Sequence, residues 1–154
     1  MKKSPHINLS HAREEHQREV MLRIEQDGVC PFCRENLERY HTKPILFENE
    51  GWIVTENFAP YTGSVHHFLL VAREHCTSPM ELSENAWVLL RTTLSKLKDM
   101  NGLEGGTFLV RWGDTERTGA SVAHLHAQLV VGVPRTESEV PILTSLGYQR
   151  PSPE

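Results

Sequence analysis

The stretch "ASVAHLHAQLVVG", residues 120–132, decides the fold because its polar and apolar side chains alternate. His124, His126 and Gln128 occupy every second position, and leucine or alanine stands between them. Because successive side chains of a β-strand point to opposite faces, this spacing predicts a strand with all three nitrogen-bearing side chains on one face. A face that is merely exposed to water would give the same pattern, and periodicity alone does not decide between the two explanations.

The rest of the chain predicts two helices and further strands. Apolar residues spaced three and four apart predict helices over 9–27 and 82–102, with Ser10 and Ser83 as N-caps and Gly28 at the end of the first. β-prone runs predict strands over 45–49, 51–56, 64–72 and 106–112, in addition to the opening stretch. Most strands follow one another without a crossover helix. The order therefore predicts an α+β fold, an antiparallel sheet of about five strands with helices packed on one side.

Length and charge limit the class of protein. A chain of 154 residues is most simply one domain and can bury a core without disulfides. No apolar run is long enough to cross a bilayer, and the start "MKKSPHINLS" has no apolar stretch of a secretory signal, so we expect a cytoplasmic protein without a membrane partner. The net charge of −4 argues against binding a nucleic acid polymer, which needs a basic surface.

The cysteines indicate metal or redox chemistry. Cys30 and Cys33 form the motif "CPFC", and Cys76 stands apart. Without an export signal, Cys-x-x-Cys is typical of a metal site or a redox pair rather than a structural bridge. Two thiolates supply half of a tetrahedral zinc site, which needs partners from elsewhere. A redox pair, a site that has lost its metal, Cys76 as an alternative ligand, and His41 or His67 as weaker candidate ligands all stay open.

The opening stretch also resembles a known family signature. "GASVAHLHAQLVVG", residues 119–132, resembles the histidine triad (HIT) motif His-φ-His-φ-His-φ-φ, with Gln128 in place of the third histidine. This His-x-His-x-Gln form is similar to the nucleotidyltransferase branch, which includes galactose-1-phosphate uridylyltransferase and diadenosine tetraphosphate phosphorylase. "ENFAPYTGSVHHFLLVAREH", residues 56–75, resembles the nucleoside-side segment of the family, and with "CPFC" the resemblance covers roughly residues 28–132.

The resemblance implies one HIT-like domain over residues 1–154. Its parts would be an N-terminal helix over 1–27, a core with the zinc and triad motifs over 28–132, and a tail over 133–154 that packs along the surface. It also implies that His75 and His124 complete the zinc site of the two cysteines. A structural zinc there would anchor the strand two residues from the middle histidine.

The resemblance makes the middle histidine, His126, the nucleophile. A neutral imidazole attacks well near pH 7 because its usual pKa is about 6.5. Attack on an α-phosphorus would give a nucleotidyl-histidine, provided that an acceptor such as a backbone carbonyl holds the other ring nitrogen. Gln128 can donate to a phosphoryl oxygen but cannot titrate near neutrality, which favours transfer to a phosphate-type acceptor over water.

Other residues are candidates for binding the nucleotide. Asn57 would bind a ribose hydroxyl, with a plain turn residue as the alternative, and Phe58 or Trp52 could flank a base or belong to the core. The Gly- and Ser-containing loop before the last strand could offer backbone N–H groups to an anion. The nucleotide- or phosphate-binding residues that we expect are Asn57, Arg111, Gly119, Ser121, His126 and Gln128. The histidines at 6, 11 and 16 are expected in solvent.

These residues lead to one principal hypothesis of function and two rivals. The principal one is nucleotidyl transfer from a nucleotide or dinucleoside polyphosphate to phosphate, a nucleotide or a sugar phosphate. The first rival is a hydrolase of dinucleoside polyphosphates or nucleoside phosphoramidates, and the second is a non-catalytic, zinc-containing nucleotide-binding module. An iron oxygenase fits poorly because the usual carboxylate ligand is not placed nearby. Family members are often homodimers, so a homodimer is one expected assembly.

Overall fold

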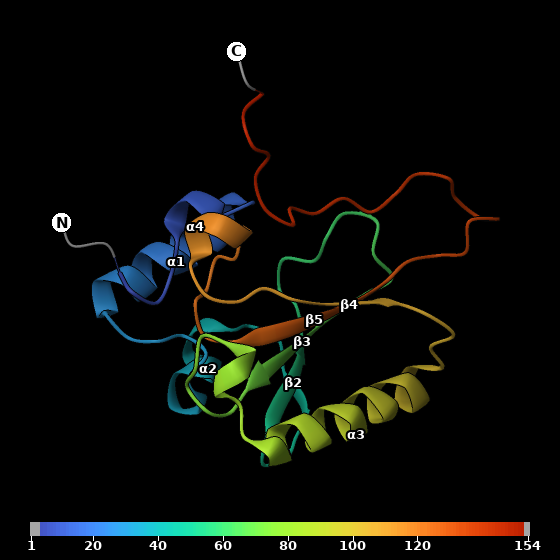
Figure 1. Cartoon of the computed structure of the whole chain (residues 1–154), viewed down its shortest axis with the longest axis horizontal. Helices are drawn as coiled ribbons and strands as arrows, with labels where there is room; N and C mark the ends of the chain where they lie inside the picture. Colours follow the sequence, from blue (N-terminus) through green and yellow to red (C-terminus); the bar gives the residue numbers. More distant parts are fainter. Residues whose placement is uncertain (1–3, 153–154) are drawn as a thin grey trace.

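The computed structural model describes residues 4–152 and contains one antiparallel sheet of five strands (Figure 1). Its order is β1-β2-β3-β5-β4, and the strands are β1 Ile45–Glu48, β2 Trp52–Glu56, β3 His66–Ala72, β4 Thr107–Val110 and β5 His126–Val131. Each strand lies within a stretch that the sequence predicted. Within the described part of the chain, no helix has both the length and the apolar character needed to cross a membrane.

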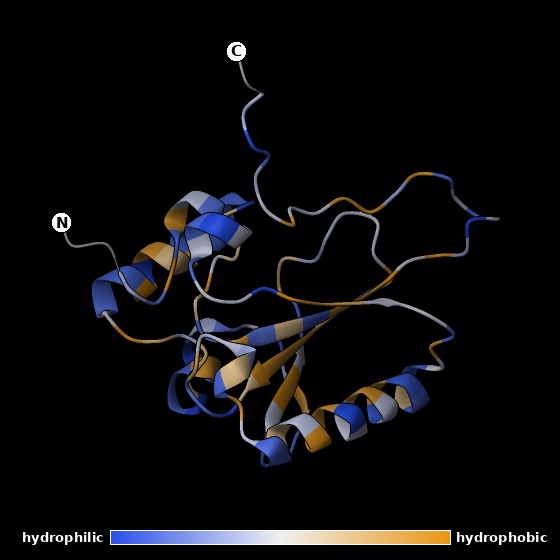
Figure 2. Ribbon diagram, viewed as in Figure 1, coloured by the Kyte–Doolittle hydropathy of each residue, from blue (hydrophilic) through white to orange (hydrophobic). Residues whose placement is uncertain are grey.

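The helices cover both faces of this sheet, and not one side as predicted. They are α1 Glu15–Asp27, α2 Arg34–Tyr40, α3 Glu84–Asn101 and α4 Thr115–Thr118, with short 3-10 turns η1 Leu9–His11 and η2 Pro79–Glu81. α3 lies along one face, with its apolar side toward the strands, while α1 and α2 lie beyond the other (Figures 1 and 2). Because β2 and β3 are central and buried on both faces, residues 52–54 and 68–72 form continuous apolar runs rather than an alternating pattern.

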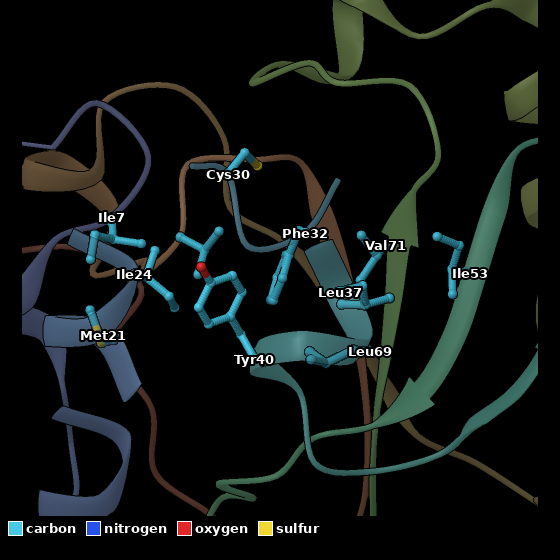
Figure 3. Close-up of a cluster of buried hydrophobic side chains, with 11 residues drawn as sticks. Ile7, Met21, Ile24, Cys30, Phe32, Leu37, Tyr40, Ile53, Leu69 and Val71 are labelled. Atoms are coloured by element: carbon cyan, nitrogen blue, oxygen red, sulfur yellow. The ribbon is translucent and has the colours of Figure 1, made fainter. Parts of the chain in front are cut away.

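Two apolar cores result, one on each face. Alternate residues of β3 separate them, since Leu69 and Val71 face α1 and α2 whereas Phe68 and Leu70 face α3. Figure 3 shows the first core, in which side chains of α1 and α2 meet those of β2 and β3. The second core contains α3 side chains together with Leu125, Ala127 and Leu129 of the β5 segment.

The ends of α3 are as predicted. Ser83 caps its start, since the Ser83 side chain accepts a hydrogen bond of 3.2 Å from the N–H of Ala86. Gly102 ends the helix in the left-handed conformation at φ 60°, where a residue without Cβ is favoured. The N-terminal helix likewise ends at Gly28, at φ 67°.

The start of the N-terminal helix differs from the prediction over 9–27. The chain forms the turn η1 first and begins α1 only at Glu15, and Ser10 is not a helix cap. Instead Asn8 accepts from the N–H of Ser10, while its amide donates to the side chains of Thr115 and Glu116. This tie to the distant helix α4 holds the first residues in place, and a periodic pattern cannot reveal such a contact.

Candidate active site and metal group

The polar side chains of β5 line a pocket between the sheet and α1. His126 and Gln128 line it, whereas the alternate residues of the same segment pack into the α3 core. The predicted alternation is therefore present, and the polar face is a pocket wall rather than a face exposed to water.

His126 is buried and presents one unprotonated ring nitrogen. Its Nδ1 lies 2.8 Å from the carbonyl oxygen of His124, which can only accept, so Nδ1 carries the proton and Nε2 keeps its lone pair. Burial is the main reason that the pKa of His126 is lowered to about 4. The ring is thus neutral near pH 7, and the edge of Phe32 packs against it at a centroid distance of 5.0 Å.

His67, considered in the sequence only as a weak metal ligand, positions Gln128. The N–H of Tyr61 donates to Nδ1 of His67 at 3.0 Å, so Nε2 carries the ring proton. That nitrogen lies 2.7 Å from Oε1 of Gln128, which accepts. The amide N–H groups of Gln128 are then left for a ligand in the pocket. Burial lowers the pKa of His67 to about 4, and so the ring remains a neutral donor. The sequence hint was the alternation of β3, which turns His67 and His66 to opposite faces.

Two arginines bring positive charge to the pocket. Arg111 lines it and donates to the hydroxyl of Tyr61 at 3.1 Å, and the guanidinium of Arg13 lies over the Tyr61 ring at 4.6 Å. Arg111 also donates to the Thr144 hydroxyl at 2.8 Å and to the Ser145 carbonyl at 2.6 Å. The C-terminal segment therefore holds the guanidinium at the pocket rim.

The loop before β5 contributes Gly119 and Ser121 to the pocket lining. The N–H of Gly119 donates to the Thr115 carbonyl at 3.3 Å, and that of Ala120 to the Thr118 hydroxyl at 3.2 Å. These two N–H groups are already paired within the loop, which is a difference from the open anion-binding loop that we expected.

Asn57 lines the pocket and also shapes a turn. Its Oδ1 accepts from the N–H of Ala59 at 2.9 Å, and its Nδ2 lies 3.2 Å from Nε2 of His67. Phe58 lines the pocket too, whereas Trp52 is a core residue whose Nε1–H donates to the Ala86 carbonyl at 2.8 Å.

The prediction that the three N-terminal histidines lie in solvent holds for only one of them. His16 is exposed. His11 instead lines the pocket, where Nδ1 lies 2.8 Å from the Ala120 carbonyl and Nε2 lies 2.9 Å from the Tyr148 hydroxyl. The ring of His6 is half-buried and packs edge-on against His75.

A second group of side chains lies behind the pocket. Cys30, Cys33, His75 and His124 come from three separate segments, yet their ligand atoms all lie within 4.8 Å of one another. Sγ of Cys30 is 3.3 Å from Nδ1 of His124, and Sγ of Cys33 is 3.2 Å from Nδ1 of His75. The fold thus brings together the two cysteines of the motif and the two histidines that the family resemblance implied as their partners.

The chemistry of this group suits a metal ion. Nε2 of His124 donates to the Ala72 carbonyl at 2.6 Å, which leaves the Nδ1 lone pair turned toward the thiols. Two sulfur and two imidazole ligands form a set that zinc binds tetrahedrally. Burial and the neighbouring Cys30 raise the pKa of Cys33 to about 12, so a nearby cation is needed for both thiols to ionise. All three cysteines are free thiols, and neither Cys76 nor His41 or His67 belongs to the group.

Several solved histidine triad proteins share this arrangement of strands and helices. A HIT family hydrolase from Clostridium thermocellum is 25% identical, with a TM-score of 0.51, and the match covers 70% of this chain and 91% of that one. A histidine triad protein from Clostridium difficile has a TM-score of 0.54 at 17% identity, covering 75% and 96%. A hypothetical histidine triad nucleotide-binding protein from Sulfolobus tokodaii has a TM-score of 0.53 at 19% identity, covering 79% and 81%.

The sequence by itself gives no such match. A scan against protein-family models finds none, and neither does a search of the curated proteins. The likeness is therefore one of fold, and it leaves the choice between transfer and hydrolysis to the chemistry of the site.

Proposed function

Because this chain has the fold of the histidine triad proteins, we propose that it transfers a nucleoside monophosphate group through a covalent intermediate on His126. One observation carries the proposal. The Nδ1 proton of His126 is held by the His124 carbonyl, so that Nε2 is an unprotonated nucleophile in the wall of a pocket. A neutral imidazole in this state can attack phosphorus without first losing a proton.

The proposed reaction has two displacements. Nε2 of His126 forms a bond to the α-phosphorus, and the bond from phosphorus to the leaving oxygen breaks, which releases a phosphate or nucleotide. An acceptor oxygen then attacks the same phosphorus, the N–P bond breaks, and the imidazole is regenerated. While the bond exists, the ring carries positive charge, which the carbonyl of His124 stabilises through Nδ1–H.

Charge that develops on the phosphoryl oxygens meets donors around the pocket. The free amide N–H groups of Gln128 are fixed by the bond from His67 to Oε1. Arg111 supplies a full positive charge at the rim. Asn57 and Ser121 line the same pocket and are the proposed contacts of the ribose and of a phosphoryl oxygen.

The proposed acceptor is a phosphate-type group, because the amide of Gln128 does not titrate near neutrality and so cannot act as a general base that activates water. Hydrolysis of the intermediate is the second candidate, since a neighbour of this fold is described as a hydrolase. An assay of product release separates the two. Faster release on adding phosphate, a nucleotide or a sugar phosphate supports transfer, whereas a rate that no acceptor changes supports hydrolysis.

We propose zinc as the ion of the metal group, in a structural role. Cys30, Cys33, His75 and His124 would all be used as ligands, leaving no open position for a substrate. When bound, zinc would supply a cross-link between segments. The metal group would thereby hold His124 in place, and the carbonyl of His124 in turn orients His126.

Mass spectrometry tests the covalent intermediate. The zinc-loaded protein is mixed with labelled dinucleoside polyphosphates or nucleotides, quenched in base and digested, because an N–P bond survives base better than acid. We expect a nucleotidyl adduct on the peptide that contains His126. The variant His126→Ala should form none and lose roughly 10³-fold or more in turnover.

Exposed His16 provides the matched control, since His16→Ala removes an imidazole that does not line the pocket. It should keep the adduct. Nucleotide binding that survives in His126→Ala, together with no adduct in the wild type under any condition, would contradict the proposal and favour a non-catalytic binding module.

A further inference from the structure

An acceptor without a partner lies in the wall of the same pocket. The ring of His41 lines the pocket and is only 7% exposed. Within residues 4–152, its Nδ1 is the buried side-chain polar atom for which no hydrogen-bond partner is found. Buried polar atoms are nearly always paired, because an unpaired one loses its bond to water without replacement. A partner supplied by a ligand would explain this exception.

The protonation of His41 is fixed by Thr55. Nε2 of His41 lies 2.7 Å from the Thr55 hydroxyl oxygen, and that hydroxyl donates its own proton to the Pro44 carbonyl at 2.9 Å. Thr55 must therefore accept from Nε2–H, and Nδ1 is left as a bare acceptor. Burial lowers the pKa of His41 to about 4, so the ring stays neutral at pH 7.

The sheet register places His41 away from the reacting phosphorus. Thr55 of β2, Leu69 of β3 and Gln128 of β5 lie side by side in one row across the sheet. Two strand spacings amount to about 9–10 Å. This is the separation between Thr55, which holds the His41 ring, and Gln128, which donates to the phosphoryl group, with Leu69 between them. In a nucleotide the ribose separates the base from the α-phosphorus, and the base of a nucleotide at His126 would extend toward His41.

The surroundings of His41 suit a flat, mostly apolar group. The ring of Phe58 meets His41 edge-on at a centroid distance of 5.9 Å, and both line the pocket. The α1 side chains of Val20, Met21 and Ile24 line it as well. A largely apolar slot with a fixed, unpaired acceptor selects a ligand by whether it brings an N–H donor there.

We propose that Nδ1 of His41 accepts a hydrogen bond from the exocyclic amino group of the nucleobase, so that the pocket prefers amino-bearing bases to the same bases without that group. This inference rests on the proposed function, because it takes the pocket to be the nucleotide site with the α-phosphorus at His126. His41 is then a specificity-determining residue and takes no part in the chemical step.

Binding of nucleoside 5′-monophosphates tests it without any reaction. Calorimetry on the zinc-loaded protein compares three pairs that each differ by one amino group: AMP with purine riboside monophosphate, CMP with 2-pyrimidinone riboside monophosphate, and GMP with IMP. In at least one pair the amino form should bind about tenfold more tightly or better. The variant His41→Phe, which keeps a flat ring but has no acceptor, should bind both members of that pair alike.

His66→Phe is the matched control. The His66 ring stacks on Phe68 at 5.3 Å, on the α3 side of the sheet, and does not line the pocket. This variant should discriminate as the wild type does. If no pair is distinguished by the wild type, or if discrimination persists in His41→Phe, the inference is wrong while the proposed function stands. If the wild type binds none of the nucleotides, the proposed function itself fails.

A measurement on the wild type covers the case in which His41→Phe does not fold. In ¹⁵N NMR, a ring nitrogen with a free lone pair moves to lower frequency when it accepts a hydrogen bond. The Nδ1 resonance of His41 should move in this way on adding the preferred amino nucleotide and not on adding its partner. The same position with both ligands would overturn the inference.

Discussion

What each buried histidine can do depends on which of its ring nitrogens carries the proton, and a backbone hydrogen-bond partner decides which one that is. His126 and His124 each donate one ring N–H to a backbone carbonyl, which turns the other nitrogen toward the pocket or toward the cysteines. His67 is held in the opposite way, because the N–H of Tyr61 donates to its Nδ1. Since the carbonyls belong to the sheet and its ends, the fold itself fixes the tautomers.

The pH dependence of adduct formation follows from the burial of His126. Because its pKa is lowered to about 4, the nucleophile stays unprotonated well below neutrality. We expect the rate of adduct formation to be nearly flat from pH 8 to about 5 and to fall as the pH approaches 4. Rapid-quench measurements with a dinucleoside diphosphate, whose phosphates do not titrate in this range, give the profile. An inflection near the ordinary histidine pKa of about 6.5 would contradict this expectation.

The same burial makes stability depend on pH. His41, His67 and His126 have pKa values of about 4 in the folded chain, below their ordinary value of about 6.5. As the pH falls through this window, the unfolded chain binds protons before the folded one, and the free energy of unfolding decreases. Urea unfolding at pH 7.5 and 5.0 should show this loss.

The variant His41→Phe should lose less free energy of unfolding between pH 7.5 and 5.0 than the wild type, which would identify His41 as one of the groups responsible. The variant His16→Phe changes an exposed ring and should leave the difference between the two pH values unchanged. An equal loss in both variants and the wild type would mean that His41 is not one of the responsible groups.

At the scale of elements, α3 supports the sheet without reaching the pocket. Its Leu90 and Leu97 are buried against the strands, and no residue of α3 lines the pocket on the opposite face. The carbonyl of Ala86, in its first turn, accepts from the buried indole of Trp52 in β2. Changes in this helix should therefore affect stability and leave the chemistry untouched.

Removing the cap of α3 tests that separation. Ser83→Ala deletes the side chain that satisfies the N–H of Ala86, and we expect the free energy of unfolding to fall by about 1 kcal/mol. Adduct formation should be unchanged. Ser95→Ala makes the same substitution at an exposed position within α3 and should shift stability by less than about 0.5 kcal/mol. Equal effects of the two variants in urea unfolding would argue against the cap.

At the scale of the whole molecule, the metal group joins segments that are remote in sequence. The segment before α2 supplies Cys30 and Cys33, the turn after β3 supplies His75, and the approach to β5 supplies His124. The approach to β5 is also tied to the loop after β3, since the Leu125 N–H donates to the Cys76 carbonyl at 2.7 Å. A bound ion would thus fasten the N-terminal third of the chain to the strand that carries the nucleophile.

Metal content and stability test this arrangement together. We expect about one zinc per chain in the wild type, as a tetrahedral four-ligand site implies, and far less in Cys30→Ser. Loss of the ion should lower the free energy of unfolding by several kcal/mol, because binding free energy is folding free energy at such a site. Elemental analysis and urea unfolding, with and without a chelator, give both quantities.

Cys76→Ala is the control for the metal group. Cys76 is buried but does not belong to the group, so this variant should retain the ion even if packing is weakened. A wild-type protein that holds no zinc after purification with added metal would contradict the structural role.

The sequence by itself determined the strands, the long helix and the polar side of the last strand. These follow from local patterns: alternation fixes which side chains share a face, and spacing of three and four fixes a helix. The same reasoning grouped His126 with Gln128, and "CPFC" indicated half of a metal site. The family resemblance then supplied His75 and His124, which the fold brings to the cysteines.

Tertiary structure alone decided what the remaining polar groups do. The helices cover both faces of the sheet, His67 holds Gln128, His41 keeps an unpaired nitrogen, and the C-terminal segment binds Arg111. Each of these depends on contacts between residues that are far apart along the chain. A periodic pattern reports only the face on which a side chain lies, whereas its partner and the position of its proton are set by whatever packs against that face.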